Sequence, residues 1–322
     1  MRLLVTGGAG FIGSHVCERL VADGHYVICL DNFVTGSPDN IAHLVGGPRF
    51  SLIEADVAAA PGVDVDHILH LASPASPVDY DRLPLETMRA NAFGTWRLLE
   101  NAQRVGAKLT FTSTSEAYGD PLVHPQPETY WGNVDPIGPR SCYDESKRFG
   151  EALIMASRRA TGVRASIVRL FNTYGPRMRV DDGRAIPELM TAAIEGRPLV
   201  VHGDGSQTRS FCYVSDLVDG LLRVALDAEV DGEVFNIGNP AELSIRELAE
   251  EIRLVIGSDS AITFDRRRPG DPERRRPDIS KIGARYGWRP AVPLSAGLRL
   301  TAEAFRTQLR RHEAKPERTA VA

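Results

Sequence analysis

The stretch Leu3-Leu4-Val5-Thr6-Gly7-Gly8-Ala9-Gly10-Phe11-Ile12-Gly13 decides the fold of this chain. Its apolar start predicts a buried strand at residues 3–5, and residues 14–22 have the pattern of a helix. Between them, glycines in a GxxGxxG spacing allow a tight turn and a close approach of the backbone to a ligand. Such a turn places free N–H groups of the helix where a pyrophosphate binds, although glycine turns also occur for structural reasons alone.

A carboxylate after the next strand strengthens this interpretation of the turn. Asp31 follows a strand expected at residues 26–30. A carboxylate roughly 20 residues beyond such a turn accepts hydrogen bonds from the adenosine ribose and repels a 2′-phosphate. No arginine stands immediately beside Asp31, so the sequence predicts NAD rather than NADP. Asp56 and Val57, after a third strand, are candidates for contact with the adenine or for a solvated loop.

Short apolar strands alternate with amphipathic helices through the first half of the chain. This alternation is typical of an α/β fold with a Rossmann-like, doubly wound parallel sheet. Further strands are expected at residues 50–54, 67–71, 109–112 and 165–170, and helices at about 85–105 and from Tyr143 onward. From Asn172 onward, loops rich in Gly, Pro and Arg interrupt the alternation, and residues 187–196 and 245–256 have helical patterns.

These patterns predict two interleaved parts and a tail. We expect residues 1–171 to form the NAD-binding Rossmann domain, with residues 211–237 returning to it. Residues 172–210 and 238–308 would form a smaller C-terminal lobe that binds the substrate. The charged, Pro-containing end at residues 309–322 is expected to be a flexible tail.

The composition excludes several classes of protein. The apolar content of 43% and charged content of 25% in 322 residues are ordinary for a soluble globular protein. A net charge of −4 provides no general basic surface for nucleic acid. The four cysteines lack CxxC spacing, which predicts neither a zinc site nor a disulfide framework and fits a reduced, cytoplasmic setting. No apolar run approaches the ~18 residues of a membrane span.

A Tyr-Lys pair then predicts the chemistry. Tyr143 and Lys147 lie one helical turn apart on the same face. There the ammonium favours the phenolate and would lower the tyrosine pKa from its reference near ~10, producing a general base for a hydroxyl group. Thr114, after the fifth strand, can bond the same hydroxyl. This spacing also occurs by chance on helix surfaces. In a chain that begins with a dinucleotide-binding turn, however, it favours oxidation of an alcohol by NAD.

Longer strings elsewhere in the chain carry a family resemblance. They are Asp31-Asn32-Phe33, His70-Leu71-Ala72-Ser73-Pro74, Thr114-Ser115-Glu116, Pro136-Ile137-Gly138-Pro139-Arg140, Phe171-Asn172-Thr173-Tyr174-Gly175-Pro176-Arg177-Met178, Gly205-Ser206-Gln207-Thr208-Arg209 and Arg275-Arg276-Pro277-Asp278-Ile279. With these strings the chain resembles an extended short-chain dehydrogenase/reductase, and within that group the UDP-glucuronate decarboxylase (UDP-xylose synthase) family. The resemblance covers residues 1 to about 308.

The resemblance implies three groups of site residues and no metal ligands. NAD would be held by Gly7, Gly10, Phe11, Ile12, Gly13, Asp31, Asn32, Phe33, Asp56, Val57, Leu71, Ala72, Ser73, Tyr143 and Lys147. The reacting centre would contain Thr114, Glu116, Tyr143, Lys147 and Arg275. The UDP-sugar would meet Tyr80, Thr114, Asn172, Arg184, Arg209 and Arg275. Guanidinium groups suit a pyrophosphate and a carboxylate, because both accept paired hydrogen bonds.

Glu116 separates the activities that the resemblance leaves open. Sugar 4-epimerases commonly have a small hydroxyl residue at this place, and 4,6-dehydratases have an Asp-Glu pair. Thr-Ser-Glu with a C-terminal arginine therefore implies decarboxylation of UDP-glucuronate to UDP-xylose, through transient oxidation at C4, loss of CO₂ and re-reduction. One alternative is a UDP-glucuronate 4-epimerase that makes UDP-galacturonate. Another is an NAD-binding regulatory protein without catalysis, although such proteins typically lose the Tyr or the Lys.

The resemblance also implies a homodimer. Its contact would involve the helices that begin near Leu85 and Asp144. The expected partners are thus a UDP-sugar substrate and a second copy of the chain, with no nucleic acid and no membrane.

Overall fold

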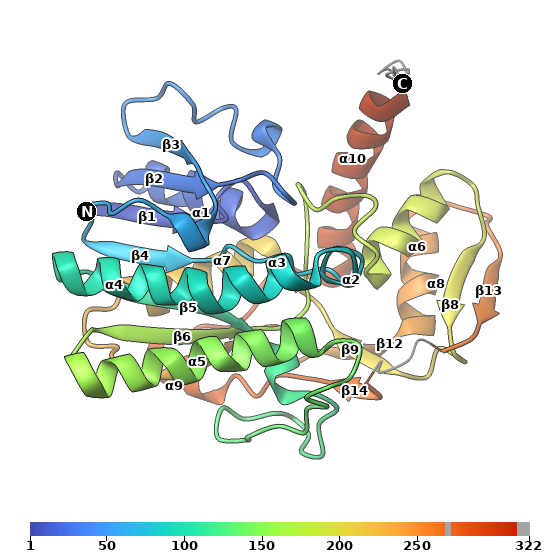
Figure 1. The fold of residues 1–322 in the computed structure, drawn as a ribbon. Helices are drawn as coiled ribbons and strands as arrows, with labels where there is room; N and C mark the ends of the chain where they lie inside the picture. Colours follow the sequence, from blue (N-terminus) through green and yellow to red (C-terminus); the bar gives the residue numbers. More distant parts are fainter. Residues whose placement is uncertain (268–271, 314–322) are drawn as a thin grey trace, which may run out of the picture.

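The computed structural model describes residues 1–267 and 272–313. Within these residues, parallel strands form a sheet in the order β11-β6-β5-β4-β1-β2-β3 (Figure 1). The strands are β1 (Arg2–Thr6), β2 (Tyr26–Asp31), β3 (Phe50–Glu54), β4 (His67–His70), β5 (Lys108–Thr114), β6 (Ala165–Leu170) and β11 (Val234–Ile237). The strand order reverses between β1 and β4, as in a doubly wound fold. The predicted fold class is confirmed.

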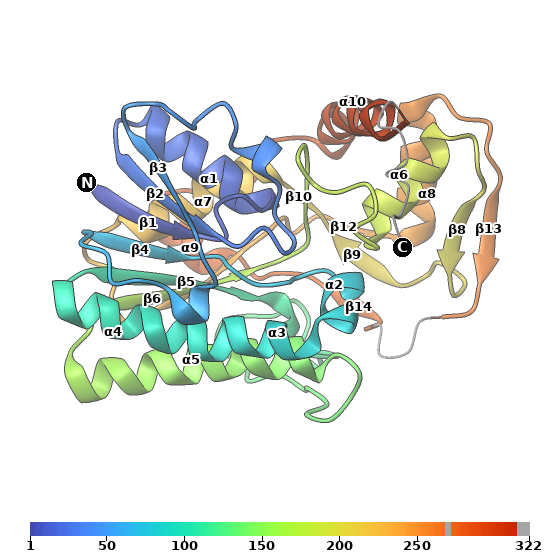
Figure 2. The same ribbon diagram turned by 45° about the horizontal axis from the view of Figure 1, so that its top comes forward.

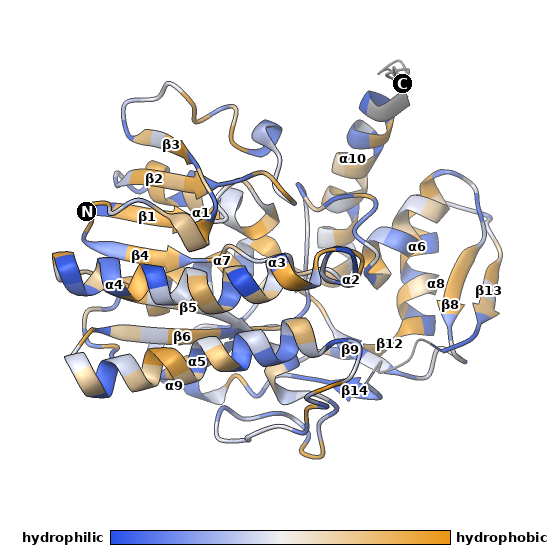
Figure 3. Cartoon of the chain, in the orientation of Figure 1, coloured by the Kyte–Doolittle hydropathy of each residue, from blue (hydrophilic) through white to orange (hydrophobic). Residues whose placement is uncertain are grey.

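The central strands form because their sequences are apolar on both faces. Leu3, Leu4 and Val5 in β1 have no exposed surface, and every residue of β5 is buried. Such runs are typical of parallel strands covered by helices on both sides. Figure 3 shows the apolar colour along most of β1 and β2 at the centre of the sheet.

Helices cover both faces of this sheet (Figures 1 and 2). One face carries α3 (Pro84–Arg89), α4 (Thr95–Val105) and α5 (Ser141–Thr161), and the other carries α1 (Phe11–Ala22) and α7 (Val214–Leu226). The helix expected over residues 85–105 continues from α3 to α4 through a π-helical segment at Ala90–Gly94. The predicted helix at residues 14–22 begins earlier, at Phe11, because Gly10 is extended and serves as its N-cap.

A smaller lobe lies beyond the carboxyl ends of the strands (Figure 2). It contains α6 (Ala185–Ile194), α8 (Ile245–Ile256), α10 (Leu294–Glu313), β8 (Leu199–His202), β13 (Ile262–Asp265), β9 (Thr208–Ser210), β12 (Glu242–Ser244) and β14 (Arg274–Arg275). Short strands β7 (Thr173–Tyr174) and β10 (Cys212–Tyr213) pair at its base, and α2 (Pro77–Arg82) and α9 (Ser280–Tyr286) complete the chain. The apolar core beneath α1 and α7 runs on into this lobe, reaching Leu199, Leu248 and Phe305.

The chain crosses between the two parts more than once. After β10 it returns through α7 to β11, which pairs with β6 in the register Val234 to Ile167. The exact domain boundaries stay a prediction, but this crossing places the smaller lobe directly over the carboxyl ends of the strands. Among the described residues, no helix is long and apolar enough to span a bilayer.

Candidate active site

A cavity of about 1200 Å³ lies at the carboxyl ends of β1, β2, β4 and β5, against the smaller lobe. In doubly wound folds this edge, where the strand order reverses, is the place for ligands. Most of the predicted site residues line the cavity. They are Gly7, Gly10, Phe11, Ile12, Gly13, Asp31, Asn32, Asp56, Val57, Leu71, Ala72, Ser73, Thr114, Glu116, Tyr143, Lys147, Asn172 and Arg184.

The glycine turn has the geometry of an anion cradle. Gly7 has a φ of +69°, and a Cβ there would lie 2.7 Å from the Cα of Ala72. A Cβ on Gly13 would lie only 2.0 Å from the carbonyl oxygen of Gly7, so the helix packs directly on the turn. No side chain caps α1 at Gly10 and no acidic residue stands in its first turn. The free N–H groups and the helix dipole therefore suit a pyrophosphate.

Asp31 stands at the end of β2 with its carboxylate facing this turn. The carboxylate accepts hydrogen bonds from the backbone N–H groups of Ala9, at 2.9 Å, and Phe33, at 2.8 Å. Burial raises the pKa of Asp31, and these backbone bonds lower it in part. Phe33 was predicted to hold NAD, but it does not line the cavity. Its backbone has a φ of 58° and directs its N–H to the carboxylate of Asp31.

Asp56 and Val57 line the same cavity at the end of β3. Asp56 also has a structural role, because its carboxylate accepts a hydrogen bond of 2.8 Å from the N–H of Ala58 and caps a short 3₁₀ turn. The cap fixes the position of both residues at the cavity edge. Their contact with adenine remains a prediction.

Tyr143 and Lys147 project from the first turns of α5 and are buried. The ammonium of Lys147 donates to the carbonyl oxygen of Thr112 at 2.9 Å, and burial lowers its pKa to about 7. The pKa of Tyr143 is raised, by burial and then by the charge of Glu116, while a hydrogen bond with Thr114 opposes the shift. The sequence pattern predicted a lowered tyrosine pKa, which is wrong for this structure because burial and the charge of Glu116 outweigh the effects of Thr114 and Arg184.

Glu116 is bound by two arginines that are far from it in sequence. Thr114 ends β5, and its hydroxyl accepts a 3.2 Å hydrogen bond from the N–H of Glu116, the second residue of the 3₁₀ helix Ser115–Tyr118. One carboxylate oxygen pairs with Arg140, and the other lies 3.5 Å from Arg275. Burial opposes ionisation, but the two guanidinium groups outweigh it and hold the pKa of Glu116 well below its usual range.

Arg140 and Asp144 had no predicted role in the site. Arg140 precedes α5 and lies over the ring of Tyr80 as well as beside Glu116. Asp144, next to Tyr143, is 7% exposed. Its position directly after a candidate catalytic residue was visible, but nothing in the spacing indicated that it would meet Glu116.

Three residues predicted to meet the substrate do not line the cavity. Tyr80 is 1% exposed and stacks on Tyr143, with 5.4 Å between ring centres. Arg209 lies in β9 and donates to the carbonyl of Thr208 at 2.7 Å. Arg275 lies in β14 and reaches the site through its ion pair with Glu116. Their contacts with a UDP-sugar remain predictions.

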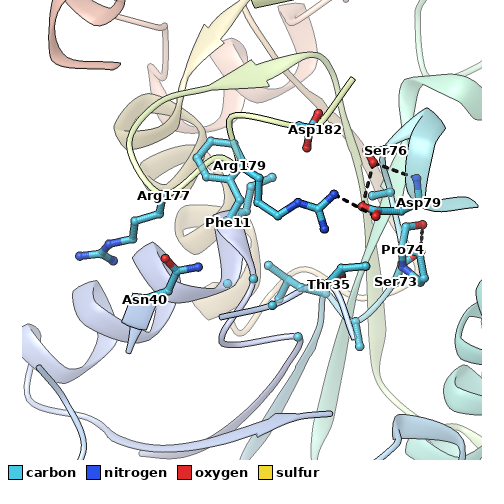
Figure 4. Close-up of a pocket in the computed structure, with 18 of the residues that line it drawn as sticks. Phe11, Thr35, Asn40, Ser73, Pro74, Ser76, Asp79, Arg177, Arg179 and Asp182 are labelled. Atoms are coloured by element: carbon cyan, nitrogen blue, oxygen red, sulfur yellow. Dashed lines mark hydrogen bonds and ion pairs between the residues drawn. The ribbon is translucent and has the colours of Figure 1, made fainter. Parts of the chain in front are cut away.

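The loop between β7 and α6 also lines the cavity, and Arg184 was the only residue after Met178 in this loop with a predicted role. Figure 4 shows Arg179 extending from this loop toward Asp79 at the start of α2, while Arg177 points away toward α1. Arg179 donates to Asp79 at 2.9 Å, and the hydroxyl of Ser76 donates to the same carboxylate at 2.7 Å. Arg184, farther along the loop, lines the cavity and pairs with Asp182. The pair of Arg179 with Asp79 joins residues 100 positions apart, beyond the reach of any local pattern.

Comparisons with known proteins agree on the type of molecule. Residues 3–238 match the model of the NAD dependent epimerase/dehydratase family. The chain is 51% identical to UDP-glucuronic acid decarboxylase 6 of Arabidopsis thaliana over 96% of this chain and 90% of that protein. It is 48% identical to UDP-glucuronic acid decarboxylase 1 of Xenopus tropicalis, over 96% of this chain and 73% of that protein.

Two solved structures with the same fold are sugar-nucleotide 4-epimerases. The structure of UDP-glucuronic acid 4-epimerase from Bacillus cereus, in complex with UDP-glucuronic acid and NAD, is similar with a TM-score of 0.87 and 30% identity, covering 96% of this chain and all of that chain. UDP-glucose 4-epimerase of Thermotoga maritima, with UDP-glucose, has a TM-score of 0.87, 31% identity and the same coverage.

Proposed function

The chain belongs to the NAD dependent epimerase/dehydratase family. We propose that it decarboxylates UDP-glucuronate to UDP-xylose. The protein is thus a carboxy-lyase. Support comes from identities near 50% to UDP-glucuronic acid decarboxylases over nearly the whole chain. The observation that carries the proposal is the position of Glu116, which is ionised between Arg140 and Arg275 and lies beside Tyr143.

The cavity fits NAD. The uncapped first turn of α1 would hold the pyrophosphate, and the Asp31 carboxylate would accept hydrogen bonds from the adenosine ribose. Lys147, Tyr143 and Thr114 line the opposite part of the cavity, where the nicotinamide and its ribose would lie. When bound, the oxidised nicotinamide accepts a hydride from C4 of the sugar and later returns it.

Tyr143 would accept the C4 hydroxyl proton as this oxidation occurs. Thr114, already in hydrogen-bonding contact with the Tyr143 hydroxyl, would orient that group. Burial lowers the pKa of Lys147 to about 7, so an anion beside Lys147 would favour its protonated, charged form. Because the pKa of Tyr143 is raised, its side chain is the neutral phenol when no cofactor is bound. A positively charged nicotinamide nearby favours the phenolate.

The C4 ketone makes loss of the carboxylate possible. The carboxylate is β to the ketone, so electrons of the breaking C5–C6 bond flow to the C4 oxygen as CO₂ leaves. Tyr143, now protonated, and Thr114 would stabilise the enolate oxygen by hydrogen bonding. Arg275 would hold the departing carboxylate, and Glu116 keeps Arg275 in position through their 3.5 Å ion pair. Protonation of C5 and return of the hydride then give UDP-xylose.

A 4-epimerase would use the same first oxidation and then reduce the opposite face of the ketone. The structural similarity to 4-epimerases at about 30% identity reflects this shared step. Epimerisation does not account for a carboxylate that forms ion pairs with two arginines next to the reacting tyrosine. Glu116 therefore favours decarboxylation.

The direct test is incubation of the purified protein and NAD with UDP-glucuronate, with UDP-glucose as the control substrate. We expect CO₂ and UDP-xylose from the first and neither from the second. UDP-galacturonate as the sole product would replace the proposal with the epimerase. Recovery of unchanged UDP-glucuronate would refute both enzymatic assignments and favour a binding protein.

We further propose that the chain forms a homodimer through α3, α4 and α5. Large apolar side chains are exposed on these neighbouring helices: Leu85, Met88, Phe93, Trp96 and Phe149. Several large exposed apolar side chains on adjacent helices are typical of an interface between protein chains. Light scattering should give twice the chain mass for the wild type and a smaller value for Trp96→Glu.

A further inference from the structure

The carboxyl groups of Glu116 and Asp144 lie in hydrogen-bonding contact with each other. Asp144 is more than nine-tenths buried, and its Oδ1 has no hydrogen-bond partner among the residues that the structure describes. Two ionised carboxylates in such contact repel each other strongly, and a carboxylate has no hydrogen to donate. One of the two must therefore carry a proton.

The surroundings decide which group carries it. Glu116 takes the ion pairs with Arg140 and Arg275, so it is the ionised member. Burial, and then the charge of Glu116, raise the pKa of Asp144 to about 8, while Arg140 and Arg275 act in the opposite direction.

The remaining groups around Asp144 do not neutralise it. Tyr80 from α2 and Tyr143 and Cys142 from α5 face it, and the pKa of each is raised, so all three are uncharged near neutral pH. Asp144 is therefore the acid of a buried Glu–Asp pair.

Substrate binding would strengthen this arrangement, a step that rests on the proposed function. The carboxylate of UDP-glucuronate would add a third acidic group to a cluster with two guanidinium groups. Keeping a proton on Asp144 balances the charge at two negative and two positive groups. The helix N-terminus at Ser141 favours an ionised acid, but its effect is small against burial next to Glu116.

We propose that Asp144 supplies, through Glu116, the proton that C5 receives after CO₂ has left. Asp144 does not line the cavity, whereas Glu116 does, so Asp144 acts through its neighbour. Asp144 first gives its proton to the ionised Glu116 carboxylate, and Glu116 passes that proton on to C5 and is ionised again. The enolate electron pair forms the C5–H bond, and the C4 ketone is restored. Asp144 regains its proton from water, which supplies the one proton consumed when a carboxylate becomes CO₂ and a C–H bond.

Asp144→Asn separates this role from a structural one. The amide keeps the size of the side chain and a hydrogen-bond donor toward Glu116, but has no proton to transfer. Glu145→Gln is the matched control, because Glu145 is on the same turn of α5 and its exposed carboxylate only faces Arg148 at 3.5 Å. Asp144→Glu, which restores an acid, serves as the rescue.

The expected results are a loss in kcat of about 10²-fold or more for Asp144→Asn, partial recovery with Asp144→Glu, and no change with Glu145→Gln. NAD binding and thermal unfolding of Asp144→Asn should match the wild type. In the wild type, kcat should fall as pH rises through about 8, because the acid form of Asp144 is lost. This alkaline decline should disappear in Asp144→Asn.

Two results would overturn the inference. One is an Asp144→Asn enzyme with wild-type kcat and pH profile. The other, which needs no variant and holds even if the variant does not fold, is a wild-type kcat that stays flat as pH rises through this range. A wild type that releases no CO₂ defeats the proposed function itself, so the two failures are distinguishable.

Discussion

Replacing Glu116 by glutamine should block decarboxylation while leaving the first oxidation intact. The change keeps the shape of the side chain and removes the charge shared by Arg140 and Arg275. Tyr143, Thr114 and Lys147 are untouched. Because the charge of Glu116 raises the pKa of Tyr143, its removal makes the tyrosine a more available base.

The expected magnitudes follow from the geometry. Breaking a buried ion pair typically costs about 3–5 kcal/mol of stability, and we expect the lower end because the amide oxygen still accepts from Arg140. Removal of the charge also lowers the pKa of Asp144, so Asp144 can ionise and partly replace it. For turnover, loss of an acid–base group costs about 10²- to 10⁴-fold, or ~3 to 5 kcal/mol in the barrier.

Three measurements check this reasoning. Urea unfolding gives the change in stability, chromatography of UDP-xylose gives kcat, and the absorbance of reduced nicotinamide in a single turnover reports the oxidation at C4. Glu128→Gln is a suitable control, because Glu128 is also a partly buried carboxylate but does not line the cavity. It accepts a hydrogen bond of 2.8 Å from the N–H of Asn236. An E116Q protein that makes UDP-xylose within about threefold of the wild-type rate would refute the role of Glu116. Equal loss of the oxidation and the decarboxylation would refute the separation of the two steps.

Three further predictions test other parts of the account. Tyr143→Phe should lower kcat by about 10³-fold while leaving NAD binding unchanged by calorimetry, because it removes the base without altering the packing on Tyr80; wild-type turnover would contradict the mechanism. Gly13→Ala should abolish NAD binding or unfold the protein, because its Cβ would lie 2.0 Å from the Gly7 oxygen; a variant that binds NAD normally would show that the turn is not held as described. Burial lowers the pKa of His67 to about 3, so on acidification the unfolded chain takes up a proton that the folded one refuses. Between about pH 7 and pH 5 the wild type should therefore lose ~2 kcal/mol more stability in urea than His67→Gln, and equal losses would mean that His67 is not buried in the neutral form.

The parts that could be predicted from the sequence are those with local physical patterns. Apolar runs of strand length, such as residues 3–5, and the glycine spacing after them require only neighbouring residues to be recognised. The same holds for the pairing of Tyr143 with Lys147 on one helix face. Glu116 was found because it directly follows a strand and Thr114.

The electrostatics of the site could not be predicted in this way. Arg140 and Arg275 meet Glu116 only because α5 and β14 converge on the end of β5. The contact between Asp144 and Glu116, and the ion pair of Arg179 with Asp79, likewise depend on tertiary packing. The pKa of Tyr143 was predicted in the wrong direction for the same reason, since burial is a property of the assembled fold.

The fate of the carboxylate carbon distinguishes decarboxylation from epimerisation and from simple binding. UDP-glucuronate with an isotopic label on that carbon can be incubated with the wild-type protein and NAD, and the products followed by NMR. The account predicts that the label leaves as CO₂ and that the remaining sugar nucleotide is unlabelled UDP-xylose. Label retained in UDP-galacturonate, or in unchanged UDP-glucuronate, would contradict it.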